Sequence, residues 1–201
     1  RTLPFWHQMM RRYGAATLEA SGAAIGLDEG QAGNSEIGHL TIGAGRCIPT
    51  MQRRIEEAYQ SGDFGENKLW ATLAKKQKLH ILGLLSAAGT HGDWRNLSRC
   101  AILAAQSGIE EIVVHAVLDG VDSPAGSAVD ILAELQQSLQ GVSGVTLGLV
   151  MGRACFCDRS GDMSITQTFR NALTGESLLH QFNDAALQNH LQQGVSEATF
   201  P

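Results

Sequence analysis

A hydroxyl, a carboxyl, an imidazole and a guanidinium group lie within one glycine-rich stretch of the sequence, residues 33–46. The side chains are those of Ser35, Glu36, His39 and Arg46. Glycine lets a loop turn tightly and approach a ligand, and a serine hydroxyl can act as an oxygen nucleophile or a metal ligand. The stretch therefore suggests a phosphoryl-transfer site. The alternative is a polar loop in which Asn34 or Ser35 merely caps a helix.

A second group of charged side chains follows three apolar segments that predict β-strands. The segments are residues 79–85, 112–118 and 145–151. His91 follows the first, Asp119 and Asp122 follow the second, and Arg153 follows the third. Arginine suits phosphate or carboxylate because its guanidinium group is a planar fork of donors. This group of residues is typical of a site for a small anionic molecule.

Helical patterns separate these predicted strands. Apolar residues recur at helical spacing from Trp94 to a stop at Gly108, and again over residues 128–139. Strands that are apolar throughout and alternate with helices indicate a parallel sheet with helices on both faces. Ligands of such α/β sheets bind beyond the carboxyl ends of the strands. We therefore expect one crevice to collect the imidazole of His91, the carboxylates of Asp119 and Asp122 and the guanidinium group of Arg153.

Each of these residues also has a purely structural interpretation. Arg153 and Arg159 could be ordinary surface arginines, and His91 could be a loop residue that donates to the backbone. The two aspartates could simply hold the turn ahead of Pro124. His115 lies in the middle of a predicted strand, and we interpret it as a buried histidine with satisfied hydrogen bonds.

The composition limits the classes of function. The chain has 201 residues, of which 43% are hydrophobic, enough for one large domain or one and a half. The formal net charge of −5 argues against a nucleic-acid partner. No apolar run approaches the roughly 20 residues of a membrane span, so we expect no membrane partner and a cytoplasmic location. The four cysteines include no C-x-x-C pair and are expected to be reduced thiols, although Cys155 and Cys157 could also ligate a metal.

Four motifs in order along the chain resemble those of one family. Residues 33–46, with residues 18–22 and Gly26-Leu27 before them, resemble the serine loop of the cofactor-independent phosphoglycerate mutases, which are alkaline-phosphatase-like metalloenzymes. Residues 83–91 are similar to the family's G-L-L-S-x-G-G-V-H segment, and residues 114–124 to V-H-A-F-L-D-G-R-D-T-P. Gly152-Arg153 and Asp158-Arg159 fall where G-R-Y-Y-A-M-D-R-D stands in the family.

The resemblance implies an α/β protein in two parts. Residues 1–48 would be an incomplete piece of a phosphatase-like domain, and residues 49–201 a phosphoglycerate-binding domain shortened at its C-terminal end. Ser35 would be the catalytic residue, taking the phosphoryl group during interconversion of 3- and 2-phosphoglycerate, and would also be a metal ligand. The substrate-binding residues would be His91, Asp122, Arg153 and Arg159. The family uses two manganese ions, acts on a small phosphorylated acid and is usually monomeric.

The sequence also departs from the family pattern. Val121 replaces an arginine, Asp93 a second histidine, and Ala87 an aspartate. Loss of the arginine removes a charged hydrogen bond worth roughly 1.5–3 kcal/mol. The first metal-ligand aspartate and the motifs expected after Pro201, including the later metal ligands, are not in this sequence. We therefore expect the 201-residue chain alone to bind no manganese pair and to be inactive.

Two classes of function remain open from the sequence. The chain is either a segment of such a mutase, or of a divergent relative acting on another phosphorylated or phosphonylated acid, or else a catalytically silent module that binds an anion or a protein. The complete polar set around Ser35 favours the enzyme.

Overall fold

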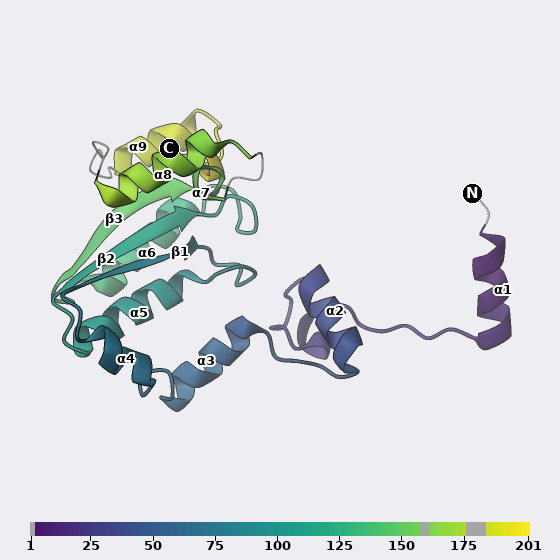
Figure 1. Ribbon diagram of the computed structural model, residues 1–201. Coiled ribbons are helices and arrows are strands. Elements are labelled where there is room, and N and C mark those ends of the chain that lie inside the picture. Colours follow the sequence, from purple (N-terminus) through teal and green to yellow (C-terminus); the bar gives the residue numbers. More distant parts are fainter. Residues whose placement is uncertain (1–2, 158–160, 176–183) are drawn as a thin grey trace. The chain divides into compact units, whose positions relative to one another are not determined.

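The computed structural model describes residues 3–157, 161–175 and 184–201 (Figure 1). It divides the chain into two compact units, Arg1–Arg54 and Ile55–Pro201. The division lies a few residues after the boundary expected at residue 48.

The first unit is built from helices. Its elements are α1 (Pro4–Tyr13), the 3₁₀ helix η1 (Gly22–Ile25), α2 (Ser35–Ala44) and the start of α3 (Met51–Ser61). Ile25, Leu27 and Ile37 form a small buried cluster. The side chain of Asn34 caps α2 by accepting the N–H of Ile37 at 3.0 Å, which satisfies one of the free donors of the first turn.

The glycine-rich stretch is largely helical rather than a tightly turning loop, and Asn34 caps that helix, as the alternative interpretation predicts. Gly38 and Gly43 lie inside α2, where each is about 1 kcal/mol less favourable than alanine. Only two of the four glycines need their missing side chain or their special backbone. A Cβ on Gly33 would lie 1.8 Å from the carbonyl oxygen of Ala20, and Gly45 ends the helix with a φ of 63°.

The second unit alternates strands and helices. Its elements are α4 (Lys68–Leu73), β1 (Lys78–Leu85), α5 (Trp94–Gln106), β2 (Glu111–Leu118), α6 (Ala128–Leu139), β3 (Val145–Gly152), α7 (Arg153–Phe156), α8 (Met163–Thr174), α9 (Asp184–Gln192) and the 3₁₀ helix η2 (Glu197–Thr199). The three predicted strands are confirmed to within a residue at each end. The predicted helices over residues 94–108 and 128–139 are also confirmed as α5 and α6.

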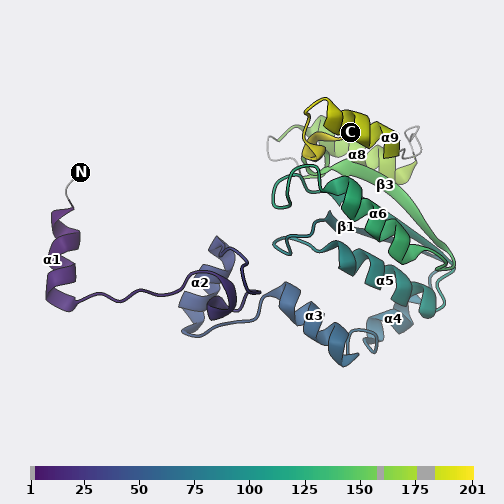
Figure 2. The ribbon, with the colours of Figure 1, turned by 180° about the vertical axis from the view of Figure 1, so that it is seen from behind.

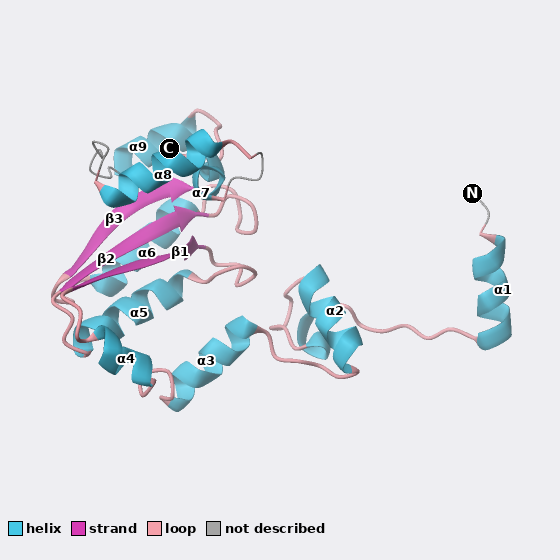
Figure 3. Cartoon of the chain, viewed as in Figure 1, coloured by secondary structure: helices cyan, strands magenta, loops and turns pink. Residues whose placement is uncertain are grey.

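The three strands form one parallel sheet in the order β1-β2-β3. Leu85 pairs with Leu118, and Leu118 pairs with Gly152, so the last residues of all three strands lie side by side. Figure 3 shows the three arrows pointing the same way, with the connecting loops beyond their tips. This register brings the residue that follows each strand to one edge of the sheet.

Helices pack on both faces of the sheet, as the sequence predicts. α5 and α6 cover one face (Figure 2), and their apolar residues join a buried core with Ile112, Val114 and Leu118. On the other face, Phe169 and Ala172 of α8 pack against Leu149 and Met151.

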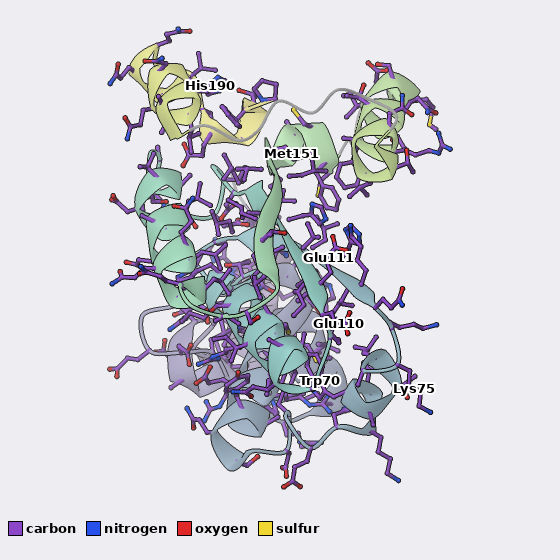
Figure 4. All side chains as sticks on the ribbon, turned by 90° about the vertical axis from the view of Figure 1, so that its left-hand side faces the viewer. Trp70, Lys75, Glu110, Glu111, Met151 and His190 are labelled. Carbon is purple, nitrogen blue, oxygen red and sulfur yellow. The ribbon has the colours of Figure 1, made fainter. Side chains whose placement is uncertain are left out.

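In Figure 4, Glu111 marks the start of β2 and Met151 lies near the end of β3, beside α7. Burial on both faces explains the continuous apolar run of β2, whereas all residues of β1 except Leu85 are half-buried or exposed. In the part of the chain that the structure describes, no helix combines the length and apolar character needed to cross a membrane.

Candidate substrate-binding site

Three polar residues directly follow the three strands at the shared sheet edge. Ser86 follows β1, Asp119 follows β2 and Arg153 follows β3. Their side chains form one connected network, because Asp119 bonds to both of the others. Parallel register thus places a hydroxyl, a carboxylate and a guanidinium group in contact, where open α/β sheets bind ligands.

The carboxylate of Asp119 is the centre of this network, although its residue is only 1% exposed. Its Oδ2 accepts the hydroxyl of Ser86 at 2.7 Å and both the N–H and the hydroxyl of Ser123 at 2.9 Å. Its Oδ1 accepts the N–H of Asp122 at 3.1 Å and Nη1 of Arg153 at 2.9 Å. Burying a carboxylate without hydrogen-bond partners is energetically costly, and these five donors offset that cost.

Burial acts to raise the pKa of the Asp119 carboxyl, but its hydrogen bonds outweigh that effect. The hydroxyl of Ser86, the N–H of Asp122 and both donors of Ser123 favour the charged form, so the pKa lies below its ordinary value. Asp119 is therefore ionised whenever the fold is intact near neutral pH. It holds the turn ahead of Pro124, as one interpretation predicted, and also fixes Arg153.

Arg153 has donors to spare. Its Nη1 donates to Oδ1 of Asp119 at 2.9 Å and to Oδ2 of Asp122 at 2.7 Å. A guanidinium group has five N–H donors. Within the described residues, those on Nε and Nη2 make no hydrogen bond to protein, and the side chain is 17% exposed. The hydrogen bond to Asp122, opposed by burial and aided by Asp119, raises the pKa of Arg153 above its ordinary value.

His91 lies at the open side of the same cluster. Its Nε2 is 4.0 Å from Oδ2 of Asp122, and the imidazole is 54% exposed. His91, Asp122 and Arg153, which the sequence predicts to share one crevice, are therefore brought together. Leaving His91 aside, the cluster has two carboxylates, Asp119 and Asp122, and one guanidinium group, Arg153, so negative charge exceeds positive charge by one. Such a site suits a molecule that offers hydroxyl groups to carboxylates as well as an anionic group to arginine.

The remaining residues singled out from the sequence have varied positions. Arg159 lies outside the described residues. His115 is buried, its Nδ1 accepts the N–H of Leu149 at 3.0 Å and its ring stacks on His80, which confirms it as a satisfied core histidine. Cys155 is a free thiol packed beside Phe156 and Phe169, and burial raises its pKa.

The three departures from the resembled family also have visible roles. Asp93 caps α5 by accepting the N–H of Arg95 at 2.9 Å, and also forms an ion pair with that side chain. The N–H of Ala87 donates to the hydroxyl of Ser123 at 3.1 Å. Val121 is 66% exposed, so it leaves an apolar side chain on the loop between Asp119 and Asp122.

Ser35 lies in the first unit, at the first position of α2, and is exposed. Its hydroxyl is 3.3 Å from Nδ1 of His39, but the same nitrogen lies 2.6 Å from the carbonyl oxygen of Ser35. Nδ1 must carry a proton to donate to that carbonyl, so it cannot also take the proton of the hydroxyl. His39 therefore does not act as a base for Ser35 in this arrangement.

The described residues contain no group of three His, Cys, Asp or Glu side chains placed to hold a metal ion. Ser35 alone does not make a site, since a catalytic metal needs about three protein ligands. The described residues therefore do not by themselves supply the ligands of a manganese pair.

Sequence reasoning missed three site residues. Ser86 and Ser123 are isolated serines, and no sequence pattern marks them as site residues. Glu197, whose carboxylate accepts the N–H of Gly126 in the loop after β2, lies far along the chain from that loop. The hydroxyl of Ser86 is also 2.9 Å from that of Ser123, so these two serines complete the cage around Asp119. Ser86 directly follows a predicted strand, and that position is the one signal that could have identified it.

Comparison with protein families settles which group this arrangement belongs to. Residues 55–199, nearly the whole second unit, match the family described as the BPG-independent PGAM N-terminus. The chain belongs to this family. The match covers every described residue of the cluster around Asp119, and confirms the resemblance predicted from the sequence motifs.

Curated relatives agree with the family. The chain is 37% identical over 176 residues to the 2,3-bisphosphoglycerate-independent phosphoglycerate mutase of Coxiella burnetii (strain RSA 493 / Nine Mile phase I), covering 85% of this chain and 34% of the relative. It is 36% identical over 205 residues to the enzyme of the same name from Legionella pneumophila (strain Corby), covering 98% of this chain and 40% of the relative. The chain thus spans between a third and two fifths of the length of these relatives.

A solved structure shares the fold. The phosphoglycerate mutase of Leishmania mexicana, crystallised at low cobalt concentration, superposes with a TM-score of 0.82 at 27% identity. The match covers 100% of this chain and 39% of that one. The fold class predicted from the sequence, an α/β protein with a parallel sheet flanked by helices, is confirmed.

Proposed function

We propose that the complete protein is a phosphoglycerate mutase that interconverts 3-phosphoglycerate and 2-phosphoglycerate, and that this chain supplies its substrate-binding region. The single observation that carries the proposal is the state of Arg153 in a chain of this family. Two carboxylates orient its guanidinium group. Nε and Nη2 make no hydrogen bond to any residue that the structure describes, so their donors are available to a ligand. Glycolysis in the cytoplasm is the setting that such a reaction implies.

The cluster offers complementary partners for each part of phosphoglycerate. The donors of Arg153 suit a carboxylate or phosphate group, which accept in the same planar geometry. Asp122, whose side chain is 23% exposed, can accept a hydroxyl of the glycerate. His91 is exposed beside it, and a ring N–H can donate to a phosphate oxygen. We assign substrate binding to these three residues and to Arg159.

Ser35 is the proposed catalytic residue. In the forward step its Oγ would lose its proton and bond to phosphorus while the bond from phosphorus to the oxygen on carbon 3 breaks, and that oxygen would take up a proton and leave as a hydroxyl group. In the return step the hydroxyl on carbon 2 would lose its proton and take the phosphoryl group, while Oγ of Ser35 leaves phosphorus and regains a proton. Its exposure at the N-terminus of a ten-residue helix supports this role, because the backbone N–H groups and the helix dipole there stabilise a bound phosphoryl group.

The first unit belongs, in this proposal, to a phosphatase-like domain that the chain contains only in part. The boundary after residue 48 predicted from the sequence and the two manganese ions remain proposals for the whole protein. Ser35 would be one metal ligand. The Leishmania mexicana phosphoglycerate mutase was crystallised at low cobalt concentration, which supports use of a divalent cation of this class.

The test is an activity assay of the full-length protein with 3-phosphoglycerate, followed by phosphorus NMR, with and without added manganese. We expect 2-phosphoglycerate to form, and to form faster with the metal. The 201-residue chain is expected to show no turnover in the same assay. Absence of product from the folded, metal-loaded full-length protein would refute the proposed reaction.

A second candidate is a related enzyme acting on another phosphorylated or phosphonylated small acid. It is favoured by Val121, which is 66% exposed where the resembled family has an arginine. The same assay run on a panel of such acids distinguishes the candidates, because the true substrate has the highest kcat/KM. A protein that binds these acids without turning any over would be the silent module.

A further inference from the structure

The last five residues before Pro201 fill the space beside the site. Gly152 donates its N–H to the carbonyl oxygen of Phe200 at 2.6 Å. A Cβ on Gly152 would lie 2.3 Å from the carbonyl oxygen of Ala198, and a Cβ on Gly120 would lie 2.6 Å from the N of Ala198. Residues 196–200, here called the C-terminal segment, therefore pack against the residues next to Asp119 and Arg153.

Glu197 is the polar residue of this segment that reaches the site loop. It is only 1% exposed, yet both of its carboxylate oxygens accept the N–H of Gly126, at 3.0 and 3.1 Å. Gly126 belongs to residues 119–127, which connect β2 to α6 and contain Asp119 and Asp122. Hydrogen bonds to a charged acceptor are about twice as strong as neutral ones, so Glu197 holds this loop firmly.

Burying a carboxylate is costly, and an apolar side chain would fill the same volume without that cost. No ion pair joins Glu197 to a cation in the described ranges. Its charge is therefore directed at the backbone of the site loop. Asp119 fixes one end of the loop through the N–H groups of Asp122 and Ser123, and Glu197 fixes the other end through Gly126.

We propose that Glu197 is a positioning residue of the substrate-binding site. By anchoring Gly126 it holds residues 119–127 so that Asp122 stays within bonding distance of Arg153 and the guanidinium donors face the ligand. Glu197 itself does not touch substrate. This role rests on the proposed function, because it gives the loop a ligand to be positioned for.

The test uses the full-length protein with Glu197→Ala, Glu197→Gln and a matched control, Glu134→Ala, which removes an exposed glutamate of α6. We expect Glu197→Ala to raise the KM for phosphoglycerate about tenfold, with kcat changed less than about twofold, as for loss of one charged hydrogen bond. Glu197→Gln keeps an oxygen that can accept from Gly126, and should recover most of the binding.

A purely structural role predicts a different pattern. Loss of folded enzyme lowers the apparent kcat and leaves KM unchanged, and glutamine would then give no selective rescue of KM. Either that pattern, or kinetics identical to Glu134→Ala, would overturn the proposal.

A second measurement keeps the inference separate from the proposed reaction. Amide hydrogen exchange of the full-length protein should show the N–H of Ser123 exchanging at least about tenfold faster in Glu197→Ala than in Glu134→Ala. Where Glu197→Ala does not fold, the Gly126 amide proton of Glu197→Gln should move upfield, because its acceptor loses charge. If the wild type turns over no phosphoglycerate but these changes appear, the reaction is wrong and the anchoring stands. If neither the hydrogen exchange of the Ser123 amide nor the chemical shift of the Gly126 amide proton changes, the proposed anchoring by Glu197 is wrong.

Discussion

The start of α2 and the cluster around Asp119 differ in how exposed their polar side chains are and in how many hydrogen bonds hold them. Ser35 is exposed, and its hydroxyl lies 3.3 Å from Nδ1 of His39. Asp119 is 1% exposed and accepts from five donors. The difference suits the two proposed roles, because a group that must react has to stay accessible, whereas groups that bind a ligand work best when already oriented.

This contrast sets the expected cost of substitution. A change at Ser35 removes the proposed nucleophilic hydroxyl but few contacts, so it should leave the stability of the fold unchanged. A change at Asp119 leaves buried donors without an acceptor, so it should reduce both stability and binding. Variants at Ser35 and at Asp119 therefore test whether the two regions differ in this way.

The largest effect is expected from Ser35→Ala in the full-length protein. Without the Oγ no phosphoserine can form, so kcat should fall at least about a thousandfold. The midpoint of thermal unfolding should stay within a few degrees of the wild type. The control is Ser61→Ala, which changes another exposed serine, at the end of α3. Undiminished kcat in Ser35→Ala would remove Ser35 from the catalytic role.

The next effect is expected from Asp119→Asn, which keeps the shape but turns an acceptor into a donor among the donors of Ser86, Ser123 and Arg153. We expect the free energy of unfolding to fall by about 2–4 kcal/mol, since a charged buried network is broken. Urea unfolding monitored by tryptophan fluorescence measures this. A loss below about 0.5 kcal/mol would show that the cage around Asp119 contributes little to the fold.

The pH dependence of the same pair of proteins checks the cause. The pKa of Asp119 is lowered in the folded state, so its contribution is present above the unfolded value of about 3.9 and is lost as pH falls through the folded value. Wild type should therefore lose stability relative to Asp119→Asn as pH falls below about 4. Parallel stability curves for the two proteins would mean that the carboxylate is not the group responsible.

A smaller effect is expected from Arg153→Ala. Loss of one charged contact should weaken 3-phosphoglycerate binding by at least about tenfold, measured by isothermal titration of the full-length protein. Arg170→Ala, an exposed arginine of α8, is the control and should bind normally. Equal affinities in the two variants would mean that the anion does not bind at this edge of the sheet.

Much of this arrangement could be predicted from the sequence, because repeated local signals carry it. Apolar runs of similar length predicted the three strands, and the parallel register then placed Asp119 and Arg153 together. The glycine-rich stretch was harder, since its glycines suggest a loop. The cap at Asn34, the acidic Glu36 in the first turn and the burial of Ile37 offset Gly38 and Gly43, and the stretch folds as α2.

The residues that hold the site in place could not be predicted in the same way. Ser86 and Ser123 matter through a contact that joins residues 37 positions apart. Glu197 reaches Gly126 across 71 positions. No local pattern records such pairs, because they depend on where the chain returns in three dimensions.

The smallest effect is expected from Val121→Arg, which restores the family's side chain at an exposed position of the site loop. An added guanidinium group offsets the excess negative charge of the cluster, but exposure to solvent screens much of the gain. We expect about fivefold tighter binding of 3-phosphoglycerate, while Val121→Gln, polar but uncharged, should gain less than twofold. Unchanged affinity in the arginine variant, with a different acid preferred by the wild type, would favour the second candidate function. It would mean that Val121 selects a ligand with an apolar group where phosphoglycerate has a charged one.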